Sequence, residues 1–262
     1  MKNIKSYLYI LWQLVKTDLL IYKEVFVSQI IDTFILTISI VCVVTYVFPQ
    51  LGMNKGYGEF FAIGAIFSSC LFQIFPVAVA FVSDITGNKT ITYPLTLPLP
   101  SWMVLAKQAV SFTLTTIPTS IIVLPIAKLL LWNRMDLSNF SLLKFIPMFL
   151  MLNVFSGLFS IFISSSVKNM GNIGKVWVRI LFPLWFFGGS QFSWQTLYGI
   201  SPKLAYLDLA NPMLYATEGI RAATLGQQGN LPFWICFMML IVFGITFGTI
   251  GILRLKKRLD FV

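Results

Sequence analysis

The charged residues of this chain whose spacing best suits a joint role are Glu218 and Arg221, which stand three positions apart in a stretch without other charges. Residues three apart share one face of a helix, so the carboxylate and the guanidinium can pair. Asn211 can cap such a helix, Pro212 fits its first turn and Gly226 ends it. The pair can line a path for a solute or hold the segment in place. The second role is favoured, because paired charges near a membrane surface often serve packing.

Catalysis by this chain is not expected, because the residues that most catalytic sites require are absent or wrongly spaced. There is no histidine, which excludes histidine-based metal sites and Ser-His-Asp or Cys-His nucleophiles. Residues 87–90, Gly-Asn-Lys-Thr, have residue types of a phosphate-binding loop without its spacing. Cys42, Cys70 and Cys236 fall in apolar runs, where thiols serve packing. The sequence therefore predicts no catalytic residue, metal or cofactor, and any ATP and Mg would be held by another chain.

The composition indicates that the solvent of this chain is a bilayer. Hydrophobic residues make up 57%, charged residues 11% and the mean hydropathy is +0.84, whereas a soluble domain carries roughly 25% charged residues. A transmembrane helix needs about 20 mostly apolar residues. We expect an all-α polytopic membrane protein with six transmembrane helices, over residues 33–54, 60–83, 108–127, 145–167, 180–202 and 222–253.

Lysine and arginine residues predict the orientation of these spans. With the N-terminus inside and six crossings, 13 of the 19 basic residues fall on the inner side and 6 on the outer side. Both termini are therefore expected in the cytoplasm. The formal charge of +10 is better explained by this topology and by anionic lipid than by nucleic acid.

The first 24 residues are expected to form an amphipathic interfacial helix rather than a signal peptide. Ile4, Leu8, Leu11, Val15 and Leu19 recur at helical spacing among lysines, as in helices that lie in the membrane surface. Such a helix can act only as a lipid anchor, or it can also contact a cytoplasmic partner.

The segment 84–101 connects the second and third expected spans on the inner side. Asp84 and Gly87 are followed by a threonine-rich stretch and then by Leu-Thr-Leu-Pro-Leu-Pro-Ser at 95–101. Prolines block a continuous helix and stiffen the chain, so movement of this loop would be passed to the spans. The simpler alternative is an ordinary proline-rich turn.

Two of these stretches resemble one known family. With Tyr215 included, residues 211–226 read N-P-x-x-Y-x-x-E-x-x-R-x-x-x-L-G, which resembles the signature of ABC-2 type transporter permeases. The segment L-x-L-P-x-P-S resembles the coupling region of the same family. The resemblance implies one transmembrane domain over 1–262 with the layout of a type V exporter, in which residues 190–230 form short re-entrant helices on the outer side before the last span.

The resemblance also implies function and partners. The chain would be the permease subunit of an ATP-driven exporter in a bacterial cytoplasmic membrane, working with two ATP-binding cassette subunits and a second copy of itself. Its substrate would be amphipathic: a lipid, a lipid-linked glycan such as teichoic acid or O-antigen, or a hydrophobic drug. The loop residues expected to contact the ATP-binding subunit are Asp84, Gly87, Asn88, Lys89, Thr90 and Tyr93.

Other residues have both a structural and a functional interpretation. The aromatic side chains of Phe182, Trp185 and Phe186 can face lipid or can stack on a substrate in the pathway. Gly244 and Gly248 form a G-x-x-x-G pattern that allows close helix packing, within the subunit or across a dimer.

Two other classes of function remain open at this stage. A secondary transporter or channel would need intramembrane charges or broken-helix repeats, and the charge-poor spans argue against ion coupling. Asp32, near the start of the first span, can have a substrate or proton role, or it can reach water or a basic neighbour at the interface. A membrane enzyme acting on lipids would need clustered polar catalytic residues, which the sequence lacks.

Overall fold

The structure, a computed structural model, describes residues 4–259 except 53–55, 88–93, 95–99 and 133, and that part contains helices and no strand. The expected all-α polytopic membrane fold is confirmed. The α-helices are α1 (Ile4–Cys42), α2 (Tyr57–Thr86), α4 (Ser101–Ile121), α5 (Val123–Leu131), α6 (Leu142–Ser166), α7 (Ile173–Val176), α8 (Phe182–Phe187), α9 (Trp194–Ile200), α10 (Pro202–Asp208), α11 (Pro212–Thr224) and α12 (Phe233–Leu259), with short 3-10 or π segments η1 (Val43–Val47), η2 (Phe48–Leu51), η3 (Met170–Asn172) and η4 (Trp177–Leu181).

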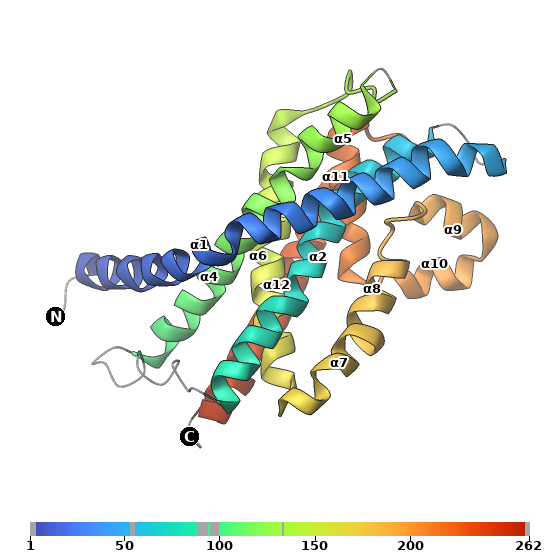
Figure 1. Cartoon of the computed structure of the whole chain (residues 1–262). Helices are drawn as coiled ribbons and strands as arrows, with labels where there is room; N and C mark the ends of the chain where they lie inside the picture. Colours follow the sequence, from blue (N-terminus) through green and yellow to red (C-terminus); the bar gives the residue numbers. More distant parts are fainter. Residues whose placement is uncertain (1–3, 53–55, 88–93, 95–99, 133, 260–262) are drawn as a thin grey trace.

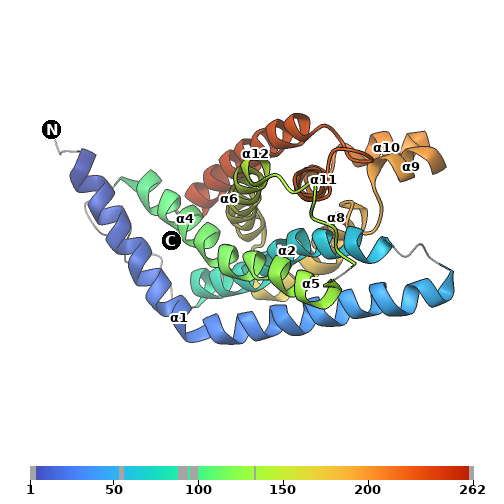
Figure 2. The same ribbon diagram turned by 90° about the horizontal axis from the view of Figure 1, so that it is seen from above.

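The centre of the bundle is α6, which packs against α2, α4, α11 and α12 (Figures 1 and 2). A Cβ atom at Gly251 of α12 would lie 2.8 Å from backbone atoms of Phe162 in α6, so glycine permits this close approach. Gly244 and Gly248 lie on the same contact, near Met151 and Leu158 of α6. These glycines therefore pack within the subunit.

Helix α1 crosses the outside of the bundle and contacts α4 and α5 (Figure 2). It runs unbroken from Ile4 to Cys42, so no gap separates the expected interfacial helix (1–24) from the expected first span. The absence of proline and glycine from this stretch explains the continuity. Figure 2 shows that the ribbon of α1 nevertheless changes direction sharply along its length.

The fifth and sixth expected spans differ from the structure. Residues 180–202 are not one helix: α8 ends at Phe187, and the chain turns at Gly188 and Gly189, where Gly189 has φ +74°. Figure 1 shows α8 ending part-way along the bundle. Residues 222–224 belong to α11, and the last long helix begins only at Phe233, because Gly226 and Gly229 both have positive φ.

The described residues contain five helices that are long and apolar enough to cross a membrane: residues 7–51, 57–86, 103–131, 142–166 and 233–258. The segment that contains α7, η4 and α8 is shorter. Six crossings therefore remain a prediction. The ends of α2, α6 and α12, together with the starts of α4 and α7, lie at one end of the bundle (Figure 1). This is the end that the distribution of basic residues assigns to the cytoplasm.

Candidate functional site

Helix α11 carries the motif, and it is buried along its whole length. The Asn211 side chain accepts a hydrogen bond from the Met213 N–H at 3.0 Å, so it caps the helix as expected, and Pro212 occupies the first turn. The Tyr215 hydroxyl donates to the Leu209 carbonyl at 2.8 Å. Beyond the helix, Gly226 adopts φ +102°, a left-handed conformation that suits glycine at a helix end.

Arg221 is fully buried and is held by backbone atoms. Its guanidinium donates to the carbonyls of Phe60 in α2 (3.1 Å), Gly189, and Ser190 (2.9 Å). The guanidinium carbon lies 3.3 Å from the centroid of the Phe60 ring. An unpaired charge in such a place is costly, and here three carbonyl dipoles and a ring face replace water. Arg221 therefore joins α11 to α2 and to the turn after α8.

Glu218, also fully buried, contacts two other segments. Its carboxylate accepts from the Trp194 N–H at the start of α9 (3.0 Å) and from the Leu231 N–H just before α12 (2.8 Å). Both groups belong to backbone that has no helical partner at these positions.

The sequence suggests that Glu218 and Arg221 can pair, but within the described part of the chain they form no direct salt bridge with each other. The Glu218 carboxylate accepts hydrogen bonds from backbone N–H groups, and the Arg221 guanidinium donates to backbone carbonyls, on different neighbouring segments. These backbone groups are available because the turns beside α11 interrupt regular helix. We call Glu218, Arg221 and these backbone partners the α11 anchor. Burial and hydrogen bonds to backbone atoms of three other segments are typical of residues that hold a segment in place.

The aromatic candidates of α8 lie partly on the surface. The rings of Phe182 and Phe186 stack at 6.1 Å, and the two residues are 47% and 40% exposed. Trp185 turns inward, and its indole N–H donates to the Ser68 hydroxyl of α2 at 2.9 Å. Its ring also lies 5.6 Å from that of Phe72, a residue that the sequence did not single out. This aromatic array therefore joins α8 to α2 and leaves two rings exposed.

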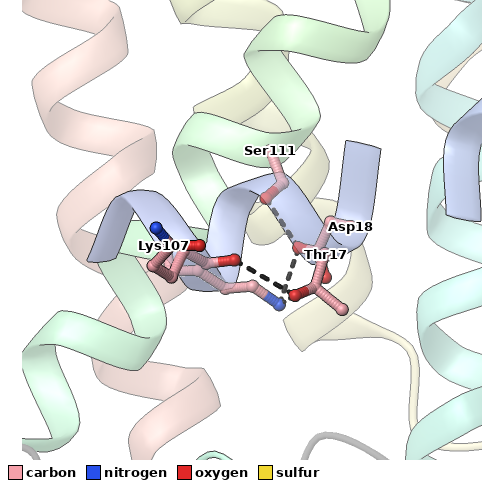
Figure 3. A network of polar contacts seen from close by, with 5 residues as sticks. Thr17, Asp18, Lys107 and Ser111 are labelled. Carbon is pink, nitrogen blue, oxygen red and sulfur yellow. Dashed lines mark hydrogen bonds and ion pairs between the residues drawn. The ribbon is translucent and has the colours of Figure 1, made fainter. Parts of the chain in front are cut away.

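A second polar cluster joins α1 to α4 (Figure 3). The Lys107 ammonium lies 2.6 Å from one Asp18 carboxylate oxygen and 2.7 Å from the other, and the Ser111 hydroxyl donates to Asp18 at 2.6 Å. One turn further along both helices, the Tyr22 hydroxyl donates to the Thr115 carbonyl at 2.9 Å. We call these five residues the α1–α4 ladder.

The sequence interpretation missed this ladder. Its signal is a matching repeat of four: Asp18 and Tyr22 on one helix face Lys107, Ser111 and Thr115 on the other. Lys107 entered the prediction only as a count toward orientation. The Lys107 side chain is 10% exposed and that of Asp18 is 26% exposed, so the ion pair is only partly shielded from solvent.

The expected coupling segment is only partly described. Asp84 lies in the last turn of α2, and the Gly87 N–H donates to the Ser83 carbonyl at 2.9 Å, which ends that helix. Asn88, Lys89, Thr90 and Tyr93 lie outside the described residues. The segment leads directly into α4, the helix that carries Lys107.

Comparison of the sequence with known protein families identifies one matching family. The family model described as ABC-2 type transporter matches residues 9–225, which include α1 from residue 9 onward, α2, α4 and the motif up to Leu225. A search of curated proteins found no match. No group of three or more His, Cys, Asp or Glu side chains that could hold a metal occurs among the described residues.

Proposed function

Because the chain belongs to the ABC-2 type transporter family, we propose that this membrane component is the permease subunit of an ATP-driven exporter. The family match over residues 9–225 is the observation that carries the proposal. The chain would form the translocation pathway, and a separate ATP-binding cassette subunit would hold ATP and Mg and hydrolyse the nucleotide. We further propose a complex of two such subunits with two copies of this chain, in a bacterial cytoplasmic membrane with both termini in the cytoplasm.

The contacts of α4 suggest how movement would pass from the ATP-binding subunit to the membrane domain. Segment 84–101 would contact that subunit through Asp84, Gly87, Asn88, Lys89, Thr90 and Tyr93. This segment continues into α4, and the α1–α4 ladder fastens α4 to α1 through Asp18 and Lys107. A push on the loop would therefore move α4 and α1 together.

The α11 anchor would provide the fixed part against which these helices move. It ties α2, α9, α11 and the segment before α12 by hydrogen bonds to backbone atoms. A fixed frame beside a movable helix pair is the arrangement that hinge or shear motions require.

The substrate would be amphipathic: a lipid, a lipid-linked glycan or a hydrophobic drug. The exposed rings of Phe182 and Phe186 support this class, because aromatic faces pack on acyl chains and stack on sugars alike.

The test is purification of the tagged full-length chain from native membranes, followed by an ATPase assay. We expect a partner with an ATP-binding cassette to co-purify, and we expect alanine substitution of residues 87–93 to abolish its recovery or its ATPase activity. Substitution of Lys203, which is exposed on α10, is the control. Recovery of the chain alone, with transport driven by an ion gradient, would replace the proposal by a secondary transporter.

A further inference from the structure

The loop between α6 and α7 borders a cavity that the proposed transport cycle does not use. The cavity has a volume of about 300 Å³ and is lined by Lys168, Lys175 and Arg179, with Asn172 and Ser166 beside them. Lys175 and Arg179 stand four positions apart on the helical segment that α7 begins, so they share a face. Three cations therefore surround one small volume.

Among the described residues, no carboxylate oxygen lies within ion-pair distance of Lys168, Lys175 or Arg179, since Asp18 and Lys107 form the ion pair found there. The local sequence also contains no Asp or Glu from residue 137 to residue 207. Lys175 donates to the Asn172 side chain at 2.6 Å, which is a neutral partner. Like charges that face one cavity repel one another unless an anion lies between them.

The neighbouring helix end does not supply that anion. The last carbonyls of α6 carry the partial negative charge of a helix C-terminus, but α12 already provides cations to them. Arg258 donates to the carbonyls of Ser164 (3.2 Å), Val167, and Lys168 (2.9 Å), and Arg254 donates to the Ser166 hydroxyl at 3.0 Å. The charges of Lys168, Lys175 and Arg179 therefore remain available to a ligand.

The rest of the lining is apolar. Val167 and Val176 are buried beneath the basic rim, together with Ile163. Outside the cavity lining, the helical segment that carries Lys175 and Arg179 also exposes Val178, Phe182 and Phe186 at spacings of four. An anionic group at the rim would thus have an apolar surface beside it, which suits an amphiphile better than a free ion.

We propose that this cavity binds the phosphate group of an anionic amphiphile at the cytoplasmic surface of the membrane. Basic pockets between helix ends on this side of a membrane recognise lipid head groups. The site depends on the chain lying in a membrane and not on its coupling to ATP, so it goes beyond the proposed function. The amphiphile can be a phospholipid of the bilayer or a phosphate-bearing substrate, and both present the same chemistry to the site.

The test uses the purified full-length chain in neutral detergent, titrated with short-chain phosphatidylglycerol and with the matching phosphatidylcholine. We expect saturable binding of the first and at least about tenfold weaker binding of the second. The variant K168Q/K175Q should weaken binding of phosphatidylglycerol by about 30-fold, because each basic residue near an anionic head group increases the affinity about five- to sixfold. The matched control K256Q/K257Q removes the same charge from the exposed face of α12 and should leave the affinity within about twofold.

Three results would overturn the proposal: equal binding of the two lipids, equal weakening by the two double variants, or displacement of the lipid by inorganic phosphate at a similar concentration. The last result would indicate a free-phosphate site. The variant K168R/K175R should retain binding, which separates lost charge from lost folding. An ATPase assay of the complex then distinguishes a bilayer phospholipid from a transported substrate. A bilayer phospholipid should change the basal ATPase rate when no substrate is present. A substrate should stimulate ATP turnover and should itself be transported.

Discussion

Within the described part of the chain, two cationic side chains are buried, and their partners differ. Arg221 is fully buried and bonds only backbone carbonyls and a ring, whereas Lys107 keeps a 10% exposed side chain and pairs with the Asp18 carboxylate of another helix. Backbone carbonyls cannot rotate away or take up a proton. A carboxylate on a partly exposed helix can separate and regain its hydration. The α11 anchor is therefore built to stay fixed, and the α1–α4 ladder is built to be separable.

The same difference follows from the local sequence. The anchor lies where glycines and short helices interrupt regular structure, at Gly188, Gly189 and Gly226, so free backbone groups are at hand. The ladder joins two long helices whose backbone groups are largely used within each helix, so side chains supply its contacts, and the Thr115 carbonyl is the one backbone group in the ladder. Interrupted backbone thus leads to rigid contacts, and continuous helices lead to contacts that side chains can exchange.

The largest effect is expected at the anchor, from Arg221→Ala. The change leaves the carbonyls of Phe60, Gly189 and Ser190 buried without their donor, which should lower the free energy of unfolding by about 3–5 kcal/mol. Arg221→Lys should recover only part of this loss, because one ammonium cannot reproduce the planar fork. Thermal unfolding in detergent measures both variants, with the exposed Lys203→Ala as control. An Arg221→Ala protein as stable as the wild type would show that the anchor is not rigid.

A smaller loss of stability is expected in the ladder, from Asp18→Ala. The change leaves the Lys107 ammonium nearly buried without its carboxylate, and we expect a loss of about 1–2 kcal/mol because the pair is partly exposed. In the intact complex, ATPase stimulation by substrate should fall by more than stability alone explains.

The charge exchange Asp18→Lys with Lys107→Asp tests whether that loss comes from the pair itself. The double variant should restore coupling above either single variant, since a pair of opposite charges is formed again. Equal defects in the double and single variants would mean that Asp18 and Lys107 act separately. The distinction between a fixed α11 anchor and a separable α1–α4 ladder would then have no consequence for coupling.

A smaller effect again is expected from Tyr22→Phe. This change removes one hydroxyl that donates to the Thr115 carbonyl at 2.9 Å and keeps the ring, including its edge contact with Phe26. A single hydrogen bond between neutral groups contributes about 1 kcal/mol. Tyr9→Phe, a change at an exposed position of the same helix, is the matched control. Unfolding midpoints that are equal for the two variants would remove Tyr22 from the ladder.

The sequence was sufficient for the fold class and the family, and it also located the important helix. Charge-free runs and the motif at 211–226 depend on local composition, and the Asn211 cap follows from residue type alone. The partners of Glu218 and Arg221 could not be predicted in this way. They are backbone atoms of residues up to 161 positions away, and backbone atoms carry no sequence signal.

The fifth expected span shows a second limit of the sequence. Residues 180–202 are apolar enough to cross a membrane, yet two adjacent glycines turn the chain after α8. Hydropathy measures only the preference of side chains for water or lipid, so it does not detect a turn that buried neighbours stabilise. In this turn, the Thr217 hydroxyl donates a hydrogen bond to the Gly188 carbonyl. The α1–α4 ladder, by contrast, had a readable signal in its spacing of four on both helices.

The last expected effect concerns Asp208, next to the anchor, and it depends on pH. Burial raises the pKa of this carboxyl to about 6; a hydrogen bond from the Asn211 side chain opposes the shift, and the charge of Glu218 adds to it. Because the folded pKa lies above the ordinary value of 3.8, the stabilising effect of the bound proton is complete below about pH 4 and is lost as pH rises through 6. Asp208→Asn should therefore flatten the pH dependence of the unfolding midpoint between these values.

Asp136 gives the opposite case in the same measurement. It lies in the exposed loop before α6, where its carboxylate accepts from the Ser138 N–H at 2.8 Å, and this bond lowers its pKa. Its contribution to stability is present above the ordinary pKa and is lost as pH falls, so Asp136→Asn should reduce stability at neutral pH and leave it unchanged in acid. Variants of Asp208 and Asp136 with the same sign of pH dependence would contradict the burial of Asp208. They would also show that water reaches the cap of α11, which a rigid anchor excludes.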